Sequence, residues 1–128
     1  MNIPSDLLYT KEHEWIRVEA DGLSATIGIT DFAQRELGDI VFVEIEPEGT
    51  ELEEGAVFGT VEAVKTVSEL YMPVSGAIAA INSGLEATPE TVNDDPHGSG
   101  WMIKITLGKP EELNSLLSAD AYNGIIGK

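Results

Sequence analysis

The chain is 128 residues long and 42% apolar, which fits a single folded domain with a hydrophobic core. Its 23 acidic residues outnumber its 7 basic ones, and the formal charge of −16 opposes binding to nucleic-acid phosphates and to anionic membranes. The absence of cysteine excludes disulfides, thiolate nucleophiles and cysteine-based metal sites.

The N-terminal segment shows no targeting signal. MNIPSDLLYTKEHEW (1–15) lacks the basic start and apolar run of a signal peptide, and it is too acidic for a transit peptide. No apolar stretch approaches the ~20 residues that a membrane-spanning helix needs. We therefore expect a cytoplasmic protein of a prokaryote, although a trimmed organellar protein would share these features.

Most of the chain has the pattern of short β-strands. WIRVE (15–19) and LSATIGI (23–29) are separated by Ala20-Asp21-Gly22, and an Asp-Gly pair between two such segments favours a hairpin. Short strands rich in valine and isoleucine and spaced by glycine and proline are typical of an antiparallel sandwich or barrel. Further strands are expected at residues 40–45, 56–64, 67–72, 76–82 and 101–107.

One helix is expected after the second predicted strand, at DFAQREL (31–37). Asp31 and Gln34 have the spacing of a capping box, in which side chains satisfy free N–H groups of the first turn. Gly38 follows, and glycine often ends a helix because it adopts the left-handed conformation at little cost.

The C-terminal part is predicted to be helical as well. Pro110 favours the start of a helix, because proline suits the first helical position. A last short helix is expected from a cap at Ser118 through Tyr122, with Gly124 at its end. The apolar face of the first of these helices consists of Leu113, Leu116 and Leu117.

Lys65 is the one basic residue between Arg35 and Lys104. The segments that begin at Gly38 and at Gly76 share the order apolar strand, acidic loop, apolar strand, and this weak symmetry places Lys65 at the tip of a hairpin. An exposed hairpin tip presents its side chain to solvent.

Three interpretations of Lys65 are open. It can be an ordinary lysine that keeps a strand edge soluble. A Schiff-base lysine needs desolvation or a neighbouring cation, whereas the neighbours Glu62 and Glu69 favour the protonated, non-nucleophilic amine. A covalent attachment point needs an exposed, isolated amine that tolerates loss of its charge, and Lys65 meets these needs.

The two histidines are candidates for other chemistry. His13 and Glu14 have the residue types of an acid–base pair, but no nucleophile motif accompanies them. His97 follows Asn93-Asp94-Asp95, yet a calcium loop that began at Asn93 would have Lys104 at its twelfth position, which cannot bind a cation. The segment is expected to form a turn instead. A Ser-His-Asp hydrolase stays open, because triads assemble in space.

Five segments in order form one pattern over nearly the whole chain. At its centre is Glu62-Ala63-Val64-Lys65, followed by Ser68-Glu69 and by Pro73-Val74-Ser75-Gly76. The five segments are YTKEHEWIRVE (9–19), IGITDFAQRELGDIVFVEI (27–45), FGTVEAVKTVSELYMPVSG (58–76), NDDPHGSGWMIKI (93–105) and ELNSLLSADAY (112–122). At this spacing they resemble the H protein of the glycine cleavage system, the lipoyl carrier of that complex.

The resemblance implies a mainly β fold of the lipoyl type. This is a hybrid barrel-sandwich of antiparallel sheets with a short helix after the second strand and a C-terminal helical segment, in one carrier domain over residues 1–128. It implies lipoic acid amide-linked to the ε-amine of Lys65, with Glu62 in the recognition motif. In this family the loaded arm folds back into a surface cleft, and Glu14 and Glu69 are expected by motif position to receive it.

The resemblance also implies partners rather than catalysis. The carrier would be non-catalytic, and we separately expect a monomer. A PLP-dependent glycine decarboxylase would load it with an aminomethyl group, and an aminomethyltransferase would pass the one-carbon unit to tetrahydrofolate. Dihydrolipoyl dehydrogenase would reoxidise the dithiol, and a lipoate ligase or octanoyltransferase would install the arm. No metal, nucleic acid or membrane is expected.

Some positions depart from the family pattern, and other carriers stay open. Ala63 stands where serine is common, Thr66 where alanine is, and His97 where tyrosine is, which bears on partner preference. Val64 and Thr66 disfavour a biotinyl carrier, which typically has methionines beside its lysine. A lipoyl domain of a 2-oxoacid dehydrogenase would usually be joined by an Ala/Pro-rich linker to a much larger chain. An H-like protein that relays lipoyl groups to other lipoate-dependent enzymes remains an alternative.

Overall fold

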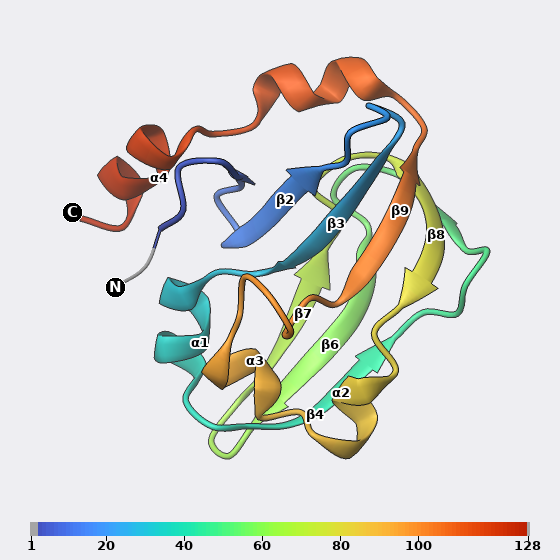
Figure 1. Cartoon of the computed structure of the whole chain (residues 1–128). Coiled ribbons are helices and arrows are strands. Elements are labelled where there is room, and N and C mark those ends of the chain that lie inside the picture. Colours follow the sequence, from blue (N-terminus) through green and yellow to red (C-terminus); the bar gives the residue numbers. More distant parts are fainter. Residues whose placement is uncertain (1–2, 128) are drawn as a thin grey trace.

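Two antiparallel sheets form the body of the molecule, which a computed structural model describes for residues 3–127 (Figure 1). The elements are, in chain order, β1 (Leu8–Tyr9), β2 (Glu14–Val18), β3 (Ser24–Ile29), α1 (Asp31–Leu37), β4 (Ile40–Ile45), β5 (Glu51–Leu52), β6 (Val57–Ala63), β7 (Val67–Tyr71), β8 (Gly76–Ile81), α2 (Gly84–Ala87), α3 (Thr91–Asp94), β9 (Ile103–Leu107), the 3₁₀ helix η1 (Pro110–Ser115) and α4 (Ala119–Ile125).

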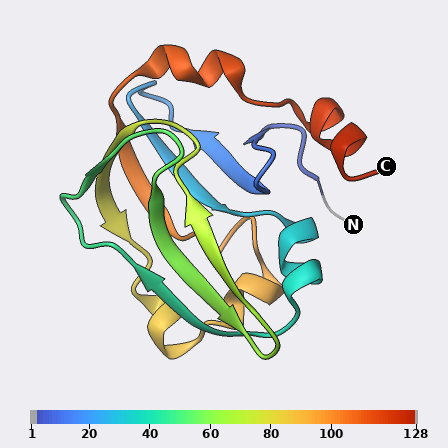
Figure 2. The same ribbon diagram turned by 180° about the vertical axis from the view of Figure 1, so that it is seen from behind.

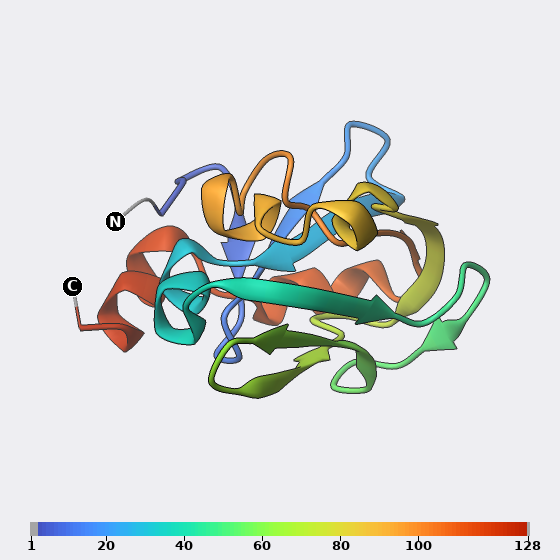
Figure 3. The same cartoon turned by 90° about the horizontal axis from the view of Figure 1, so that it is seen from below.

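The larger sheet has six strands in the order β1-β2-β3-β9-β8-β5, and the smaller has three in the order β4-β6-β7. Seen from behind, the smaller sheet lies in front of the larger one (Figure 2). The helices α1, α2 and α3 gather at one end of both sheets (Figure 3). The tip of the β6–β7 hairpin projects at this same end, so the hairpin turn lies on the side of the molecule where α1 is found (Figures 1 and 2).

The main core lies between the two sheets. Ile27 and Ile103 of the larger sheet and Val61 of the smaller are fully buried, and they belong to one continuous cluster of apolar side chains. Burying a side chain of this size stabilises the fold by about 2 kcal/mol. The alternation of apolar and polar residues along β9 and β6 is therefore the pattern that directs one face of each sheet inward.

A second, smaller core fastens the C-terminal helix to β1 and β2. Tyr9 and Tyr122 stack with ring centroids 4.8 Å apart, and both rings are fully buried together with Trp15. The chain around Tyr9 also pairs with Leu117 through two backbone hydrogen bonds of 2.8 Å. The tail is thus an integral layer of the fold.

The mainly β architecture confirms the predicted fold class, and the helix at 31–37 has the predicted bounds. Its cap was predicted wrongly. The N-cap is Thr30, whose hydroxyl accepts from the N–H of Ala33 at 3.1 Å, so Asp31 is the first helical residue. Thr30, and not Asp31, is the cap because its extended backbone conformation directs the hydroxyl toward the first turn of the helix. Gly38 ends the helix with φ 82°, as predicted.

The C-terminal prediction needs two corrections. The segment from Pro110 is a 3₁₀ helix and not an α-helix. α4 begins after the predicted cap Ser118, but it runs through Gly124 to Ile125, because glycine lowers helix stability without forbidding it. The short helices α2 and α3, and the strands β1 and β5, were not predicted. The strand predicted at 101–107 begins at Ile103.

A glycine beneath Trp15 provides a test of this packing. A Cβ on Gly28 would lie 2.7 Å from Cζ2 of Trp15, and the indole cannot yield because its Nε1 donates to the Pro96 carbonyl at 2.8 Å. We expect Gly28→Ala to lower the free energy of unfolding by about 1–3 kcal/mol, measured by urea denaturation. Gly124→Ala is the control, since its added Cβ meets nothing within 4 Å and alanine favours the helix, so this variant should be at least as stable as wild type. Equal stability of Gly28→Ala and wild type would contradict this packing.

Candidate functional site

Lys65 lies exposed in the turn that joins β6 to β7. The N–H of Ala63 donates to the Thr66 carbonyl at 2.8 Å, and the N–H of Val64 donates to the Asp39 carbonyl at 3.2 Å. These two bonds fix the turn both across the hairpin and to the segment before β4. Within residues 3–127 no carboxylate pairs with the Lys65 amine. The amine is therefore presented to solvent from a fixed bend.

Next to this turn, the outer face of the smaller sheet carries three neighbouring side chains. Its register places Phe42 of β4, Glu62 of β6 and Val67 of β7 side by side, and all three side chains are exposed. Two large apolar side chains thus flank Glu62, with 45% of Phe42 and 60% of Val67 exposed. Glu62 points away from the inner face of the hairpin.

A cleft of about 260 Å³ opens beside the hairpin. Its walls come from the start of β2, from α1 and from β7. Four of its lining residues are acidic and none is a lysine or arginine: Glu12, Glu14, Glu36 and Glu69. Both predicted arm-docking residues are therefore brought together in one acidic cleft, although 55 positions separate them in the sequence.

Glu14 is the buried acid of this cleft, with 2% of its surface exposed. Oε1 accepts from the Thr10 hydroxyl at 2.6 Å, and Oε2 accepts from the N–H of Tyr71 at 3.3 Å. Burial raises the pKa of Glu14 to about 7, against the opposing effect of these two hydrogen bonds. The side chain is thus a desolvated carboxyl that changes charge near neutrality.

Glu69 occupies a different environment. It is exposed on β7, and its Oε1 accepts from the Tyr71 hydroxyl at 3.3 Å. Lys65 precedes it by four residues, which is about 13 Å along an extended strand. The cleft therefore begins within reach of a long group attached to Lys65.

Sequence reasoning did not assign His13 and Phe32 to this site. His13 adopts a left-handed φ of 69°, its ring lies 4.8 Å from that of Phe32, and both line the cleft. The Nδ1 atom of His13 lies 2.8 Å from the hydroxyl of Tyr122. The His13-Glu14 pair marked His13 as a candidate in the sequence. Its hydrogen-bond partner Tyr122 is 109 residues away, and no local sequence pattern indicates this contact.

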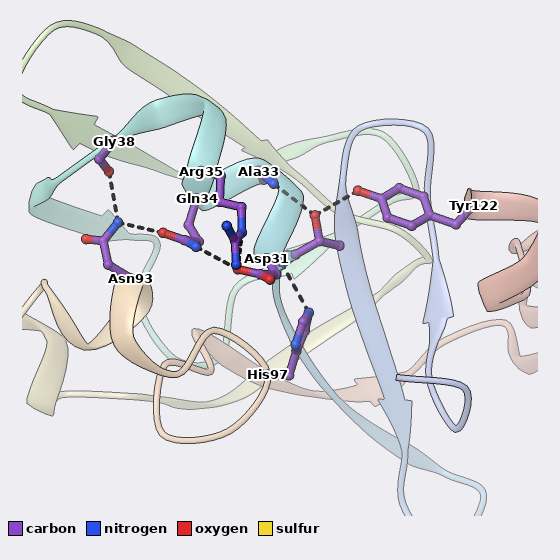
Figure 4. A network of polar contacts seen from close by, with 9 residues as sticks. Asp31, Ala33, Gln34, Arg35, Gly38, Asn93, His97 and Tyr122 are labelled. Carbon is purple, nitrogen blue, oxygen red and sulfur yellow. Dashed lines mark hydrogen bonds and ion pairs between the residues drawn. The ribbon is translucent and has the colours of Figure 1, made fainter. Parts of the chain in front are cut away.

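The helix α1, one wall of the cleft, is anchored by polar contacts (Figure 4). The N–H of Asp31 donates to Nε2 of His97 at 3.2 Å. The Asn93 amide donates to Oε1 of Gln34 and to the Gly38 carbonyl, each at 2.9 Å. The turn predicted over residues 93–101 is only partly confirmed: Asn93 lies in α3, and His97 lies in the turn that follows it. Together the two side chains hold α1 in place.

Three other features were considered among residues 3–127: a metal centre, a hydrolase triad and a membrane-spanning helix. No group of three or more side chains in residues 3–127 is arranged to hold a metal ion. No serine hydroxyl there is hydrogen-bonded to His13 or His97, as a hydrolase triad would require. No helix within these residues has the length and apolar character needed to cross a membrane.

Comparisons with known proteins show the family to which the chain belongs. The family described as "Glycine cleavage H-protein" matches residues 7–128. A glycine cleavage system H protein of Salinibacter ruber is 66% identical over 122 residues, which cover 95% of this chain and 97% of that protein. One from Chlorobium phaeovibrioides is 58% identical over 127 residues, 99% of either chain.

A solved structure shows the same fold. The crystal structure of a glycine cleavage system H protein from Mycobacterium marinum matches with a TM-score of 0.87 at 36% sequence identity, over 98% of this chain and 100% of that chain. Sequence and structure lead to one conclusion, which also confirms the resemblance of the five segments. The chain belongs to the glycine cleavage H-protein family.

Proposed function

We propose that this chain is a non-catalytic lipoyl carrier in which Lys65 holds lipoic acid through an amide on its ε-amine. The position of Lys65 carries the proposal: the amine is exposed at a fixed hairpin turn and has no carboxylate partner within residues 3–127. Amide formation removes the positive charge, and here it deprives no buried acid of its counter-ion. The site fits the group that the family bears.

The reactive sulfur atoms belong to the lipoyl group, and the chain supplies position and electrostatics. The cargo in this proposal is an aminomethyl group, whose amine is protonated at neutral pH. We assign Glu14 and Glu69 to the docking of that amine, because a carboxylate stabilises a cation and the cleft holds four acids without a lysine or arginine. The burial of Glu14 strengthens this attraction by excluding water.

The carrier is proposed to move among several enzymes. It receives its cargo from a PLP-dependent glycine decarboxylase, passes it to an aminomethyltransferase, and presents the reduced dithiol to dihydrolipoyl dehydrogenase. A lipoate ligase or octanoyltransferase modifies Lys65 and recognises Glu62. Glu62 is exposed near the end of β6, just before the turn. The relatives named above are bacterial, and we place the carrier in the bacterial cytoplasm.

We further infer one carrier domain over residues 1–128, of which residues 1, 2 and 128 lie outside the described part. A monomer is expected to suffice, because Lys65 and all four acids of the cleft come from one chain.

A decarboxylase exchange assay tests this function. We expect glycine decarboxylase to exchange labelled bicarbonate into the carboxyl group of glycine when the lipoylated protein is added, and not when unmodified protein is added. Lipoylation is verified beforehand by intact mass, so a failed modification is recognised separately. A fully lipoylated protein that supports no exchange would contradict the shuttle, and transfer of its lipoyl group to other lipoate-dependent enzymes would then favour the relay function.

A further inference from the structure

The C-terminal helix reaches the wall of the acidic cleft through one hydroxyl group. Tyr122 of α4 is fully buried, and its hydroxyl lies 2.7 Å from Oγ1 of Thr30 and 2.8 Å from Nδ1 of His13. Figure 4 shows the Tyr122 ring extending from α4 toward the start of α1. A residue near the end of the chain therefore contacts His13, which lines the cleft, and Thr30, which caps the helix that forms one of its walls.

The direction of these hydrogen bonds follows from Thr30. Its hydroxyl oxygen already accepts from the N–H of Ala33, and its other hydrogen bond within residues 3–127 is to Tyr122. Since Thr30 is fully buried, its single hydrogen must go to the Tyr122 oxygen or remain without an acceptor. Tyr122 then donates its own hydrogen to Nδ1 of His13, which makes that nitrogen an acceptor.

The backbone and ring of His13 are held independently of this chain of bonds. Its N–H donates to the Thr10 carbonyl at 3.1 Å, and its carbonyl accepts from the N–H of Thr30 at 3.0 Å. Its ring packs on Phe32 with centroids 4.8 Å apart. The imidazole thus has one orientation, with Nδ1 as acceptor and the hydrogen on Nε2, which is the neutral form.

The charge of His13 matters because of what surrounds it. Glu12 and Glu14 flank it in sequence, Glu36 faces it from α1, Glu69 lies across the cleft on β7, and Tyr122 bonds it from α4. Burial lowers the pKa of His13, while the nearby Glu12 and Glu36 oppose this effect. A protonated His13 would place a cation in a cleft whose other charged lining residues are all acidic.

We propose that Tyr122 is a positioning residue that holds His13 in the neutral Nε2–H form, so that the cleft keeps its acidic character for a protonated amine. The identity of that amine rests on the proposed function, whereas the order of the hydrogen bonds does not. The helical tail would thereby act on cargo retention without touching the cargo.

The first test uses unmodified protein labelled with ¹⁵N in histidine. We expect the NMR spectrum of wild type to show the His13 hydrogen on Nε2. Tyr122→Phe, which keeps the ring that stacks on Tyr9, should mix the two tautomers and raise the pH at which His13 titrates by about 0.5–1. His97 is an internal reference with the opposite tautomer, because its Nε2 accepts from Asp31.

Tyr9→Phe is the matched control. Tyr9 is equally buried, but its hydroxyl donates to the Pro4 carbonyl and not to His13, so the tautomer and titration of His13 should match wild type. A wild-type hydrogen on Nδ1 of His13 would overturn the proposal. So would a Tyr122→Phe protein with unchanged His13 signals. Both outcomes are read without lipoylation, so they are separate from any failure of the proposed function.

The second test uses lipoylated protein loaded with the amine. Between the titration midpoints of the two proteins, Tyr122→Phe should release the amine several-fold faster than wild type and Tyr9→Phe. At higher pH, where His13 is neutral in all three, the rates should converge. Equal release rates across the whole pH range would refute the link between Tyr122 and retention.

Discussion

Replacement of Lys65 by arginine is expected to abolish lipoylation completely while leaving the fold intact. A guanidinium group cannot take the place of the amine in the amide. Lys65 is exposed and has no carboxylate partner within residues 3–127, so the free energy of unfolding should change by no more than about 0.5 kcal/mol. Intact-mass analysis after incubation with lipoate–protein ligase measures the first effect, and urea denaturation measures the second.

Lys104→Arg is the matched control. Lys104 is also exposed, but it lies on β9 with its amine 5.2 Å from the centroid of the Trp101 ring, away from any hairpin turn. This variant should be modified to the same extent as wild type. A lipoyl group found on the Lys65→Arg protein would exclude Lys65 as the acceptor.

The second large effect is expected from Glu14→Gln in the loaded protein. Glutamine has nearly the same shape, and its carbonyl can still accept from Thr10, but it carries no charge. Loss of a charged hydrogen bond costs about 1.5–3 kcal/mol, which is about a 10- to 150-fold faster loss of the amine at pH 8. The rate of amine release from lipoylated, loaded protein measures it.

The matched control for this variant is Glu19→Gln. Glu19 accepts from the Thr26 hydroxyl at 2.8 Å, as Glu14 does from Thr10, but it lies outside the cleft. Its substitution should leave amine release unchanged. Equal retention by wild type and Glu14→Gln would remove Glu14 from the docking site.

The same substitution has a predictable effect on stability. The pKa of Glu14 is about 7 in the fold and 4.5 as its ordinary value, so between these pH values the folded state binds more protons than the unfolded state. Wild-type stability should therefore fall as the pH rises from 4.5 to 7, by about 3 kcal/mol from this group. In Glu14→Gln this fall should disappear, which urea denaturation across that range would reveal.

The strands could be predicted because their apolar pattern is local. Ile40–Ile45 was predicted at its observed bounds, since a short segment rich in valine and isoleucine between Gly38 and an acidic loop favours one short strand. The N-cap of α1 could not be predicted in the same way. Asp31 and Thr30 are both good capping residues, and the backbone angle that selects Thr30 depends on tertiary structure.

The site could be predicted only in part. The isolation of Lys65 indicated something unusual, but charge pattern alone left three interpretations, and the motif resemblance was needed to choose among them. The cleft was not predictable from local sequence, because its walls come from β2, α1 and β7. The burial of Glu14 and the contact between His13 and Tyr122 arise from long-range packing for the same reason.

Site mapping on the wild-type protein tests the central claim most directly. After incubation with lipoate–protein ligase, fragmentation of the digested protein should locate the whole lipoyl mass increment on Lys65, in the turn after Ala63. The amines of Lys11, Lys104 and Lys109 should remain free. A wild-type chain that stays unmodified, or an increment located on Lys104 or Lys109, would contradict the account.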